Sequence, residues 1–75
     1  MDFPKALQEL AAGNPVSRAL KEEGYLDVQF EPNGEYTVNT GGMKASFDIL
    51  RWNGAGPVYE ELTEEDKAAT DWQIV

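Results

Sequence analysis

The chain has 75 residues, with 14 acidic and six basic side chains, and a formal charge of −8 at neutral pH. It contains no cysteine and no histidine, which excludes disulfides, thiolate nucleophiles, a Ser-His-Asp triad and any metal site not built from carboxylates. This length allows one domain with one small core, and so acidic a surface disfavours direct binding to nucleic acid.

Membrane and export signals are not evident in the sequence. No apolar run approaches the roughly 20 residues that span a bilayer, and the beginning "MDFPKALQEL" lacks the basic and apolar regions of a signal peptide. We therefore expect a cytoplasmic protein without a membrane partner. A chain of 75 residues is also too small for the deep cleft that catalysis by paired carboxylates needs, so we expect no enzymatic activity and no cofactor.

The first segment, "DFPKALQELAAGNP", is typical of an amphipathic helix. Asp2 can cap its first amides, Pro4 fits the first turn, and Gly13 ends it. The following "NPVSRALKEEG" can form a second short helix between Asn14 and Gly24, and a strand over "PVSRAL" is the alternative. The residues predicted to face the core from the first helix are Phe3, Ala6, Leu7, Leu10 and Ala11.

From Tyr25 the apolar residues alternate, which indicates strands. The stretch "YLDVQF" is followed by Asn33-Gly34, a strong signal for a type I′ hairpin turn, and then by "EYTVNT". Gly41-Gly42 predicts another turn before a third strand over "MKASFDILRW". The expected result is an antiparallel meander.

The last third begins with a glycine-containing loop, "NGAGPVYEE", with a brief extended piece at Val58-Tyr59. Thr63 then begins a short acidic helix in which Asp66 completes a capping box, and "DWQIV" is a final strand anchored by Trp72. The predicted fold is α+β, with one or two N-terminal helices packed on a three- to four-stranded antiparallel sheet and a short acidic helix before the C-terminal strand.

The densest charge cluster lies between residues 60 and 66. Its spacing does not match an EF-hand loop, so we predict no metal site. A solvated helix face is the simplest interpretation, and a surface that binds a basic protein or imitates nucleic-acid phosphates is the alternative. The cluster consists of Glu60, Glu61, Glu64, Glu65 and Asp66.

The stretch "RWNGAGP" combines a cation, a stacking surface and glycines that permit close backbone approach. These are ingredients for holding a base or a phosphate. The alternative is that Trp52 belongs to the core or closes the sheet edge. Arg18 and Arg51 are the two guanidinium groups available for an anion.

Both ends of the chain carry a longer pattern. The beginning follows F-x-x-A-L-x-x-L-x-x-G and then V-x-R, and the ending follows L-x-x-x-D-x-x-A-x-D-W before an apolar strand. These patterns resemble a family of small phage proteins that includes the type-two Thoeris anti-defence proteins and a related anti-CRISPR protein. The matching positions are Phe3, Ala6, Leu7, Leu10, Gly13, Val16 and Arg18, then Leu62, Asp66, Ala69, Asp71, Trp72, Ile74 and Val75.

The resemblance implies an α+β homo-oligomer in the cytoplasm of a bacterial host, which sequesters a cyclic ADP-ribose-type or cyclic nucleotide immune signal without cleaving it. On this hypothesis Arg18 binds phosphate, Trp52 stacks on a base, and Asp71 binds a ribose hydroxyl. The family usually carries Gly-Trp soon after V-x-R, whereas "ALKEEGYLD" follows here, and Tyr25 and Trp52 are the candidates to substitute for the missing tryptophan. The competing hypotheses are an acidic module that inhibits a basic, nucleic-acid-binding protein, and a structural domain with neither activity.

Overall fold

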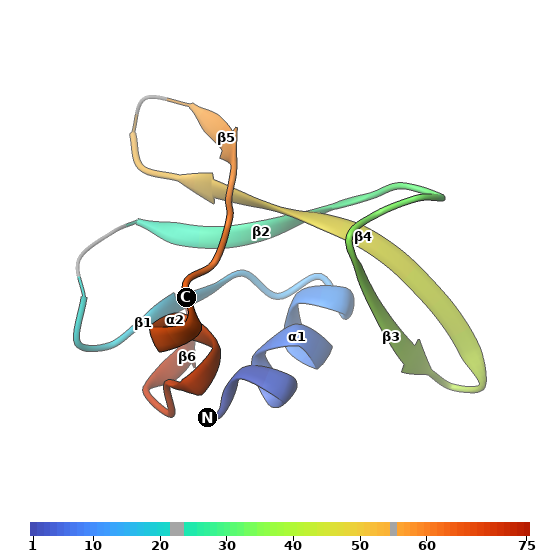
Figure 1. Cartoon of the computed structure of the whole chain (residues 1–75), viewed down its shortest axis with the longest axis horizontal. Coiled ribbons are helices and arrows are strands. Elements are labelled where there is room, and N and C mark those ends of the chain that lie inside the picture. The colour runs from blue at the N-terminus through green and yellow to red at the C-terminus, as the bar shows by residue number, and fades with distance from the viewer. Residues whose placement is uncertain (22–23, 55) are drawn as a thin grey trace.

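The computed structural model describes residues 1–21, 24–54 and 56–75, and within them it shows two helices and a curled antiparallel sheet of six strands (Figure 1). The α+β class is therefore confirmed, but the sheet is larger than the three to four strands predicted. The strand order is β3-β4-β2-β1-β6, with β5 also paired to β4. The elements are α1 (Phe3–Ala11), β1 (Val16–Arg18), β2 (Tyr25–Phe30), β3 (Tyr36–Thr40), β4 (Met43–Trp52), β5 (Pro57–Tyr59), α2 (Glu64–Ala68) and β6 (Trp72–Ile74).

Helix α1 forms as its sequence predicts. The Asp2 carboxylate accepts a hydrogen bond from the backbone N–H of Lys5 at 3.0 Å, which caps the first turn. Beyond the helix, Gly13 adopts a φ of +93°, a conformation that favours glycine. The helix buries Phe3, Ala6 and Leu10 against the sheet.

The predicted second helix is wrong where the structure describes the segment, because Val16–Arg18 forms strand β1. The strand alternative is confirmed over these three residues. Strand β1 pairs with β2 on one side and with β6 on the other, and Val16 is fully buried between them. These pairings with distant segments outweigh the local helix signals, since a short helix is marginal without packing. The part of the helix prediction that falls on residues 22 and 23 lies outside the described residues.

Strand β4 is the longest strand and lies between β2 and β3 in the sheet. Phe47 of β4 pairs with Phe30 of β2 on one edge and with Tyr36 of β3 on the other. The predicted hairpin between β2 and β3 is therefore wrong, and so is the simple meander. The intervening segment 31–35 carries the chain from one edge of β4 to the other (Figure 1).

The two predicted turns, Asn33-Gly34 and Gly41-Gly42, have different roles that the sequence did not distinguish. Neither Asn33 nor Gly34 has a positive φ, so they do not form the predicted type I′ turn. A Cβ on Gly34 would lie 2.4 Å from the Phe47 backbone nitrogen, so this glycine permits the close crossing over β4. Gly41 and Gly42, with φ values of +56° and +81°, form the predicted two-residue turn between β3 and β4.

The core lies between α1 and the concave face of the sheet, and Trp72 of β6 belongs to it, with its ring 5.9 Å from that of Phe3. No helix among the described residues is long and apolar enough to cross a membrane. Phe30 and Ile74, which end β2 and β6, are 54% and 53% exposed. The buried apolar residues are Phe3, Ala6, Leu10, Val16, Leu26, Phe47, Ile49, Leu62 and Trp72.

Candidate functional site

The structure brings Arg18 and Asp71, two of the predicted ligand contacts, together as an ion pair. Arg18 Nε donates to Asp71 Oδ1, and Arg18 Nη1 donates to Asp66 Oδ1 at 2.9 Å. The guanidinium carbon lies 5.7 Å from the centre of the Trp72 ring, and the Arg18 side chain is only 10% exposed. The other carboxylate oxygen of Asp71 accepts from the backbone N–H of Leu20 at 2.9 Å. These contacts tie β1 to α2 and β6.

The charges of this cluster stabilise one another. Burial acts to lower the pKa of Arg18, but hydrogen bonds and negative charge from Asp71 and Asp66 raise it overall. Burial acts to raise the pKa of both carboxyls, but hydrogen bonds lower it overall. Asp66 accepts these bonds from Thr63 and Arg18, and Asp71 accepts them from Leu20 and Arg18. Because two carboxylates already offset one guanidinium, the cluster offers little attraction to an added phosphate.

Asp66 lies inside the protein, although the sequence placed it in the acidic surface cluster. Its side chain completes the predicted capping box with Thr63, whose hydroxyl is 3.0 Å from Asp66 Oδ2. Its backbone carbonyl accepts the indole N–H of Trp72 at 3.0 Å, and the residue is 5% exposed. Asp66 therefore joins the helix, β1 and β6 through side-chain and backbone bonds.

Tyr25 and Trp52 form a second pair, where β2 begins and β4 ends. They are cross-strand neighbours, and their rings stack at 6.4 Å with an interplanar angle of 10°. Trp52 is 36% exposed. Gly24 precedes Tyr25 with a φ of +75°, and a Cβ there would lie 2.0 Å from the Trp52 carbonyl oxygen. The described contacts join Arg18 to Asp71 and Tyr25 to Trp52, but do not join one pair to the other.

The four other acids predicted as a surface fall into two groups. On α2, Glu65 forms an ion pair with Lys21 at 2.9 Å, and Glu64 approaches Lys67 at 3.9 Å. After β5, Glu60 accepts from Arg51 at 3.0 Å, and Glu61 is exposed.

Two of these acids, Glu60 and Glu61, belong to a larger acidic group whose other members, Glu31, Glu35 and Asp48, were missed by the sequence reasoning. The pKa of Tyr36 is raised by burial and then by the negative charges of Glu35, Glu60, Glu61 and Asp48. Glu31 joins them, because hydrogen bonding to Asp48 is the main cause of its raised pKa. We call the surface formed by Glu31, Glu35, Asp48, Glu60 and Glu61 the acidic face.

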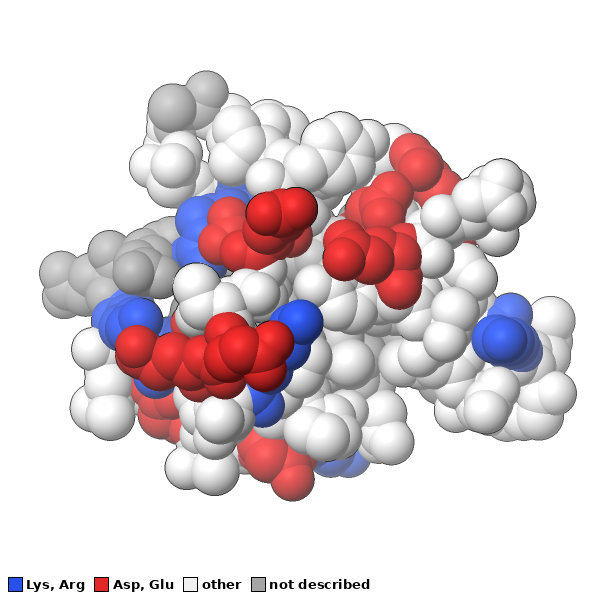
Figure 2. Space-filling view, viewed as in Figure 1, with Lys and Arg blue, Asp and Glu red and all other residues white. Residues whose placement is uncertain are grey.

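The acidic face collects carboxylates from segments that are separate in the chain. Figure 2 shows acidic side chains beside β5, beside β4 and over α2 on one side of the molecule. The sequence does place Asp48 on the polar face of its strand. Glu31 and Glu35 lie near Asp48 because segment 31–35 crosses β4, and the pattern of residues along the sequence does not predict that crossing. Among the described residues, no group of three or more acids is placed to hold a metal ion.

Comparison with protein-family models, curated proteins and solved structures finds no match for this chain. The resemblance to the phage counter-defence family therefore stays a prediction.

Proposed function

We propose that this chain is a non-enzymatic binding protein that uses its acidic face to bind a basic partner protein. The observation that carries the proposal is the gathering of acids around β4. The Glu35 N–H donates to Asp48 Oδ1 at 3.0 Å, the Glu60 N–H donates to the Ile49 carbonyl at 3.0 Å, and Figure 2 shows acidic side chains beside both β4 and β5. At a net charge of −8 the chain has few bases to offset them: Arg51 contacts Glu60 at 3.0 Å, while Arg18 and Lys21 contact acids outside the acidic face.

This arrangement favours a partner whose surface is positively charged. Complementary charge accelerates encounter and suppresses wrong partners, and its effect falls as salt is added. The basic surface of a nucleic-acid-binding protein has the required chemistry, whereas nucleic acid itself would be repelled. Glu64 and Glu65 contribute less, because Lys67 and Lys21 lie beside them.

The test is affinity capture from a bacterial lysate on the immobilised chain, at low and at high salt, with captured proteins identified by mass spectrometry. We expect basic proteins that are released by salt and lost from Glu35→Lys and Glu61→Lys. Glu64→Lys is the matched control, because it makes the same charge change outside the acidic face. Equal loss from all three variants would mean that net charge alone governs capture and would overturn the proposal.

A second candidate function is sequestration of a cyclic ADP-ribose-type or cyclic nucleotide signal by a homo-oligomer. The observation that favours it is the Tyr25–Trp52 stack, in which Trp52 keeps an exposed surface at the end of β4. A base could stack there, and aromatic stacking contributes about 1–3 kcal/mol per base. Because the charge of Arg18 is offset within the subunit, the phosphates would need basic groups at a subunit interface.

A thermal-shift screen with cyclic ADP-ribose isomers and cyclic di- and trinucleotides tests this second function, with the mass in solution measured alongside. A ligand at roughly 100 times its Kd stabilises the folded state by about 2.7 kcal/mol. A shift in wild type that disappears in Trp52→Ala would support sequestration. No shift with any of these nucleotides would contradict it.

A further inference from the structure

The first half of β4 has an unpaired edge. Strand β2 leaves β4 at the Phe30–Phe47 pair, while β3 continues along the opposite edge as far as Met43. On the β2 side, no strand among the described residues lies beside residues 43–46. The Ser46 carbonyl accepts from the Glu31 N–H at 3.2 Å on this side. Because backbone groups alternate between the two edges, the N–H and C=O of Lys44 face the same unpaired edge.

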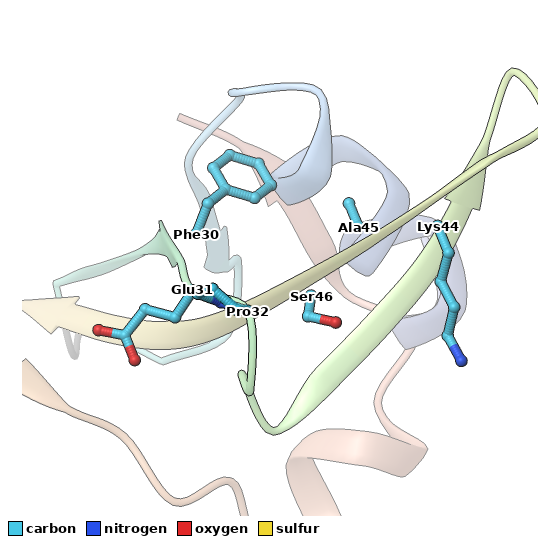
Figure 3. A pocket seen from close by; sticks show the side chains of 6 residues that line it. All are labelled: Phe30, Glu31, Pro32, Lys44, Ala45 and Ser46. Atoms are coloured by element: carbon cyan, nitrogen blue, oxygen red, sulfur yellow. The ribbon is translucent and has the colours of Figure 1, made fainter.

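A groove lies beside this edge. It has a volume of about 390 Å³ and is formed where the chain turns away after β2 (Figure 3). Phe30 and Ala45 point to one side of β4, and Lys44 and Ser46 point to the other. The Phe30 ring packs edge-on against Phe47 at 6.0 Å and is 54% exposed, so an apolar contact surface is already positioned there. The lining residues are Phe30, Glu31, Pro32, Lys44, Ala45 and Ser46.

We propose that this edge binds an extended segment of the basic partner protein, which adds as a strand antiparallel to β4 and in line with β2. The inference rests on the proposed function and names how the partner is held. Main-chain hydrogen bonds to Lys44 would supply the pairing, as in other cases of strand addition. Alternate side chains of the segment would lie on Phe30 and Ala45.

The charges along the groove fix which part of the segment is basic. An antiparallel strand begins beside Ser46 and Glu31 and ends beside Lys44. Glu31 lies opposite Ser46 and is therefore the diagonal neighbour of Asp48 on the same face of the sheet, so a cation placed there would relieve the repulsion between the two carboxyls. The N-terminal part of the bound segment therefore carries Lys or Arg, followed by alternating apolar residues.

A second copy of this chain fits the edge less well. Each copy carries a charge of −8, and pairing two β4 edges would also bring the two Lys44 side chains together. Like charges opposite each other destabilise a strand pair. The charge complementarity therefore selects a basic partner over self-association.

The experiment selects short random linear peptides, displayed on phage, against the immobilised full chain. Enriched peptides are synthesised, and their affinities for wild type, Lys44→Pro and Lys44→Ala are measured by fluorescence anisotropy. Proline removes the N–H that faces the unpaired edge, but leaves the groups of Met43, Ala45 and Phe47 that face β3. Lys44→Ala is the matched control, because it removes the charge and keeps the N–H.

We expect peptides with Lys or Arg near the N-terminus, and a loss of about tenfold in affinity for Lys44→Pro but little loss for Lys44→Ala. Hydrogen exchange of the Lys44 amide in wild type, followed by NMR, should slow when peptide binds. This second measurement does not depend on how well the proline variant folds.

Several results would overturn the inference. Peptides that bind without slowing exchange at Lys44 would refute strand addition, and the proposed function would survive if Glu61→Lys still abolished their binding. Peptides that protect Lys44 but ignore Glu35→Lys and Glu61→Lys would instead refute the acidic face as the binding determinant. A dimer of the chain alone that Lys44→Pro dissociates would show that a second copy occupies the edge. Enrichment of no peptide would overturn strand addition, whereas the acidic face would still be decided by the lysate capture with Glu35→Lys, Glu61→Lys and Glu64→Lys.

Discussion

The guanidinium of Arg18 donates from Nη1 to Oδ1 of Asp66 at 2.9 Å, across 48 positions of the chain. The bond holds β1, an inner strand of the sheet, against the first turn of α2. The Trp72 indole N–H donates to the carbonyl of the same aspartate, so one residue connects three elements. We infer that this cluster stabilises the fold, and that the binding surface lies elsewhere.

Asp66→Ala is expected to destabilise the protein strongly. The substitution removes one partner of a buried ion pair and the acceptor in the capping box, which together typically cost about 3–5 kcal/mol. Urea unfolding followed by circular dichroism measures the change. Glu64→Ala, on the same helix but with a side chain that is 96% exposed, should change stability by less than about 0.5 kcal/mol. Similar costs for both variants would contradict the structural role of Asp66.

The sequence predicted one half of this cluster and could not predict the other. Thr63 and Asp66 are three residues apart, and a capping box is recognisable at that spacing. The contacts of Arg18 with Asp66 and Asp71 depend on β1 lying beside β6, which joins the two ends of the chain. Arg18 could therefore be recognised as one of two guanidiniums, but its neutralisation by two carboxylates could not.

Gly34 and Gly41 should respond differently to asparagine, which tolerates the left-handed region better than most residues. Gly34→Asn places a Cβ within 2.4 Å of the Phe47 backbone, and such overpacking costs about 1–3 kcal/mol. A Cβ at Gly41 would meet no atom within 4 Å, and asparagine suits the first position of a type I′ turn. Gly41→Asn should therefore change the free energy of unfolding very little. The free energies of unfolding of the two variants provide the comparison. A larger loss at Gly41 than at Gly34 would contradict the crossing over β4.

The two glycine turns also show which part of the fold could not be predicted from the sequence. Asn33-Gly34 and Gly41-Gly42 carry equivalent local turn signals, but only Gly41 and Gly42 adopt the positive φ that the signal implies. Strand β4 pairs with β2 and β3 on opposite edges, and that choice depends on contacts over the whole sheet. Apart from β1, which was expected to be part of a helix, the strands could be predicted from the alternation of apolar residues, whereas their order in the sheet could not. The position of Glu31, Glu35 and Asp48 near Glu60 and Glu61 was missed for the same reason.

Acid should weaken the cluster around Arg18. The pKa values of Asp66 and Asp71 are lowered in the folded protein, so their contribution to stability is present above their ordinary value of 3.8 and is lost as the pH falls through the folded values. Thermal unfolding across an acidic pH series should show this loss in wild type. In Asp71→Asn the stability should be lower at neutral pH and should fall less on acidification. A parallel fall in both proteins would show that other groups govern acid unfolding.

Glu31→Gln should have the opposite pH dependence. The pKa of Glu31 is raised above its ordinary value of 4.5, chiefly by its hydrogen bond with Asp48, so the protonated carboxyl stabilises the fold at low pH. That contribution is lost as the pH rises through the folded pKa. Glutamine keeps a hydrogen-bond donor for Asp48 at every pH, so the variant should melt at a higher temperature than wild type at neutral pH, with the difference shrinking below the ordinary pKa.

Melting temperatures of wild type and Glu31→Gln over a pH series measure this difference. Glu64→Gln is the control, because it removes the same charge from an exposed position on α2. If both variants gained the same stability at neutral pH, general charge repulsion would explain the gain. A gain confined to Glu31→Gln would show that the two carboxyls meet at the end of the groove, where the basic residue of a bound segment is proposed to lie.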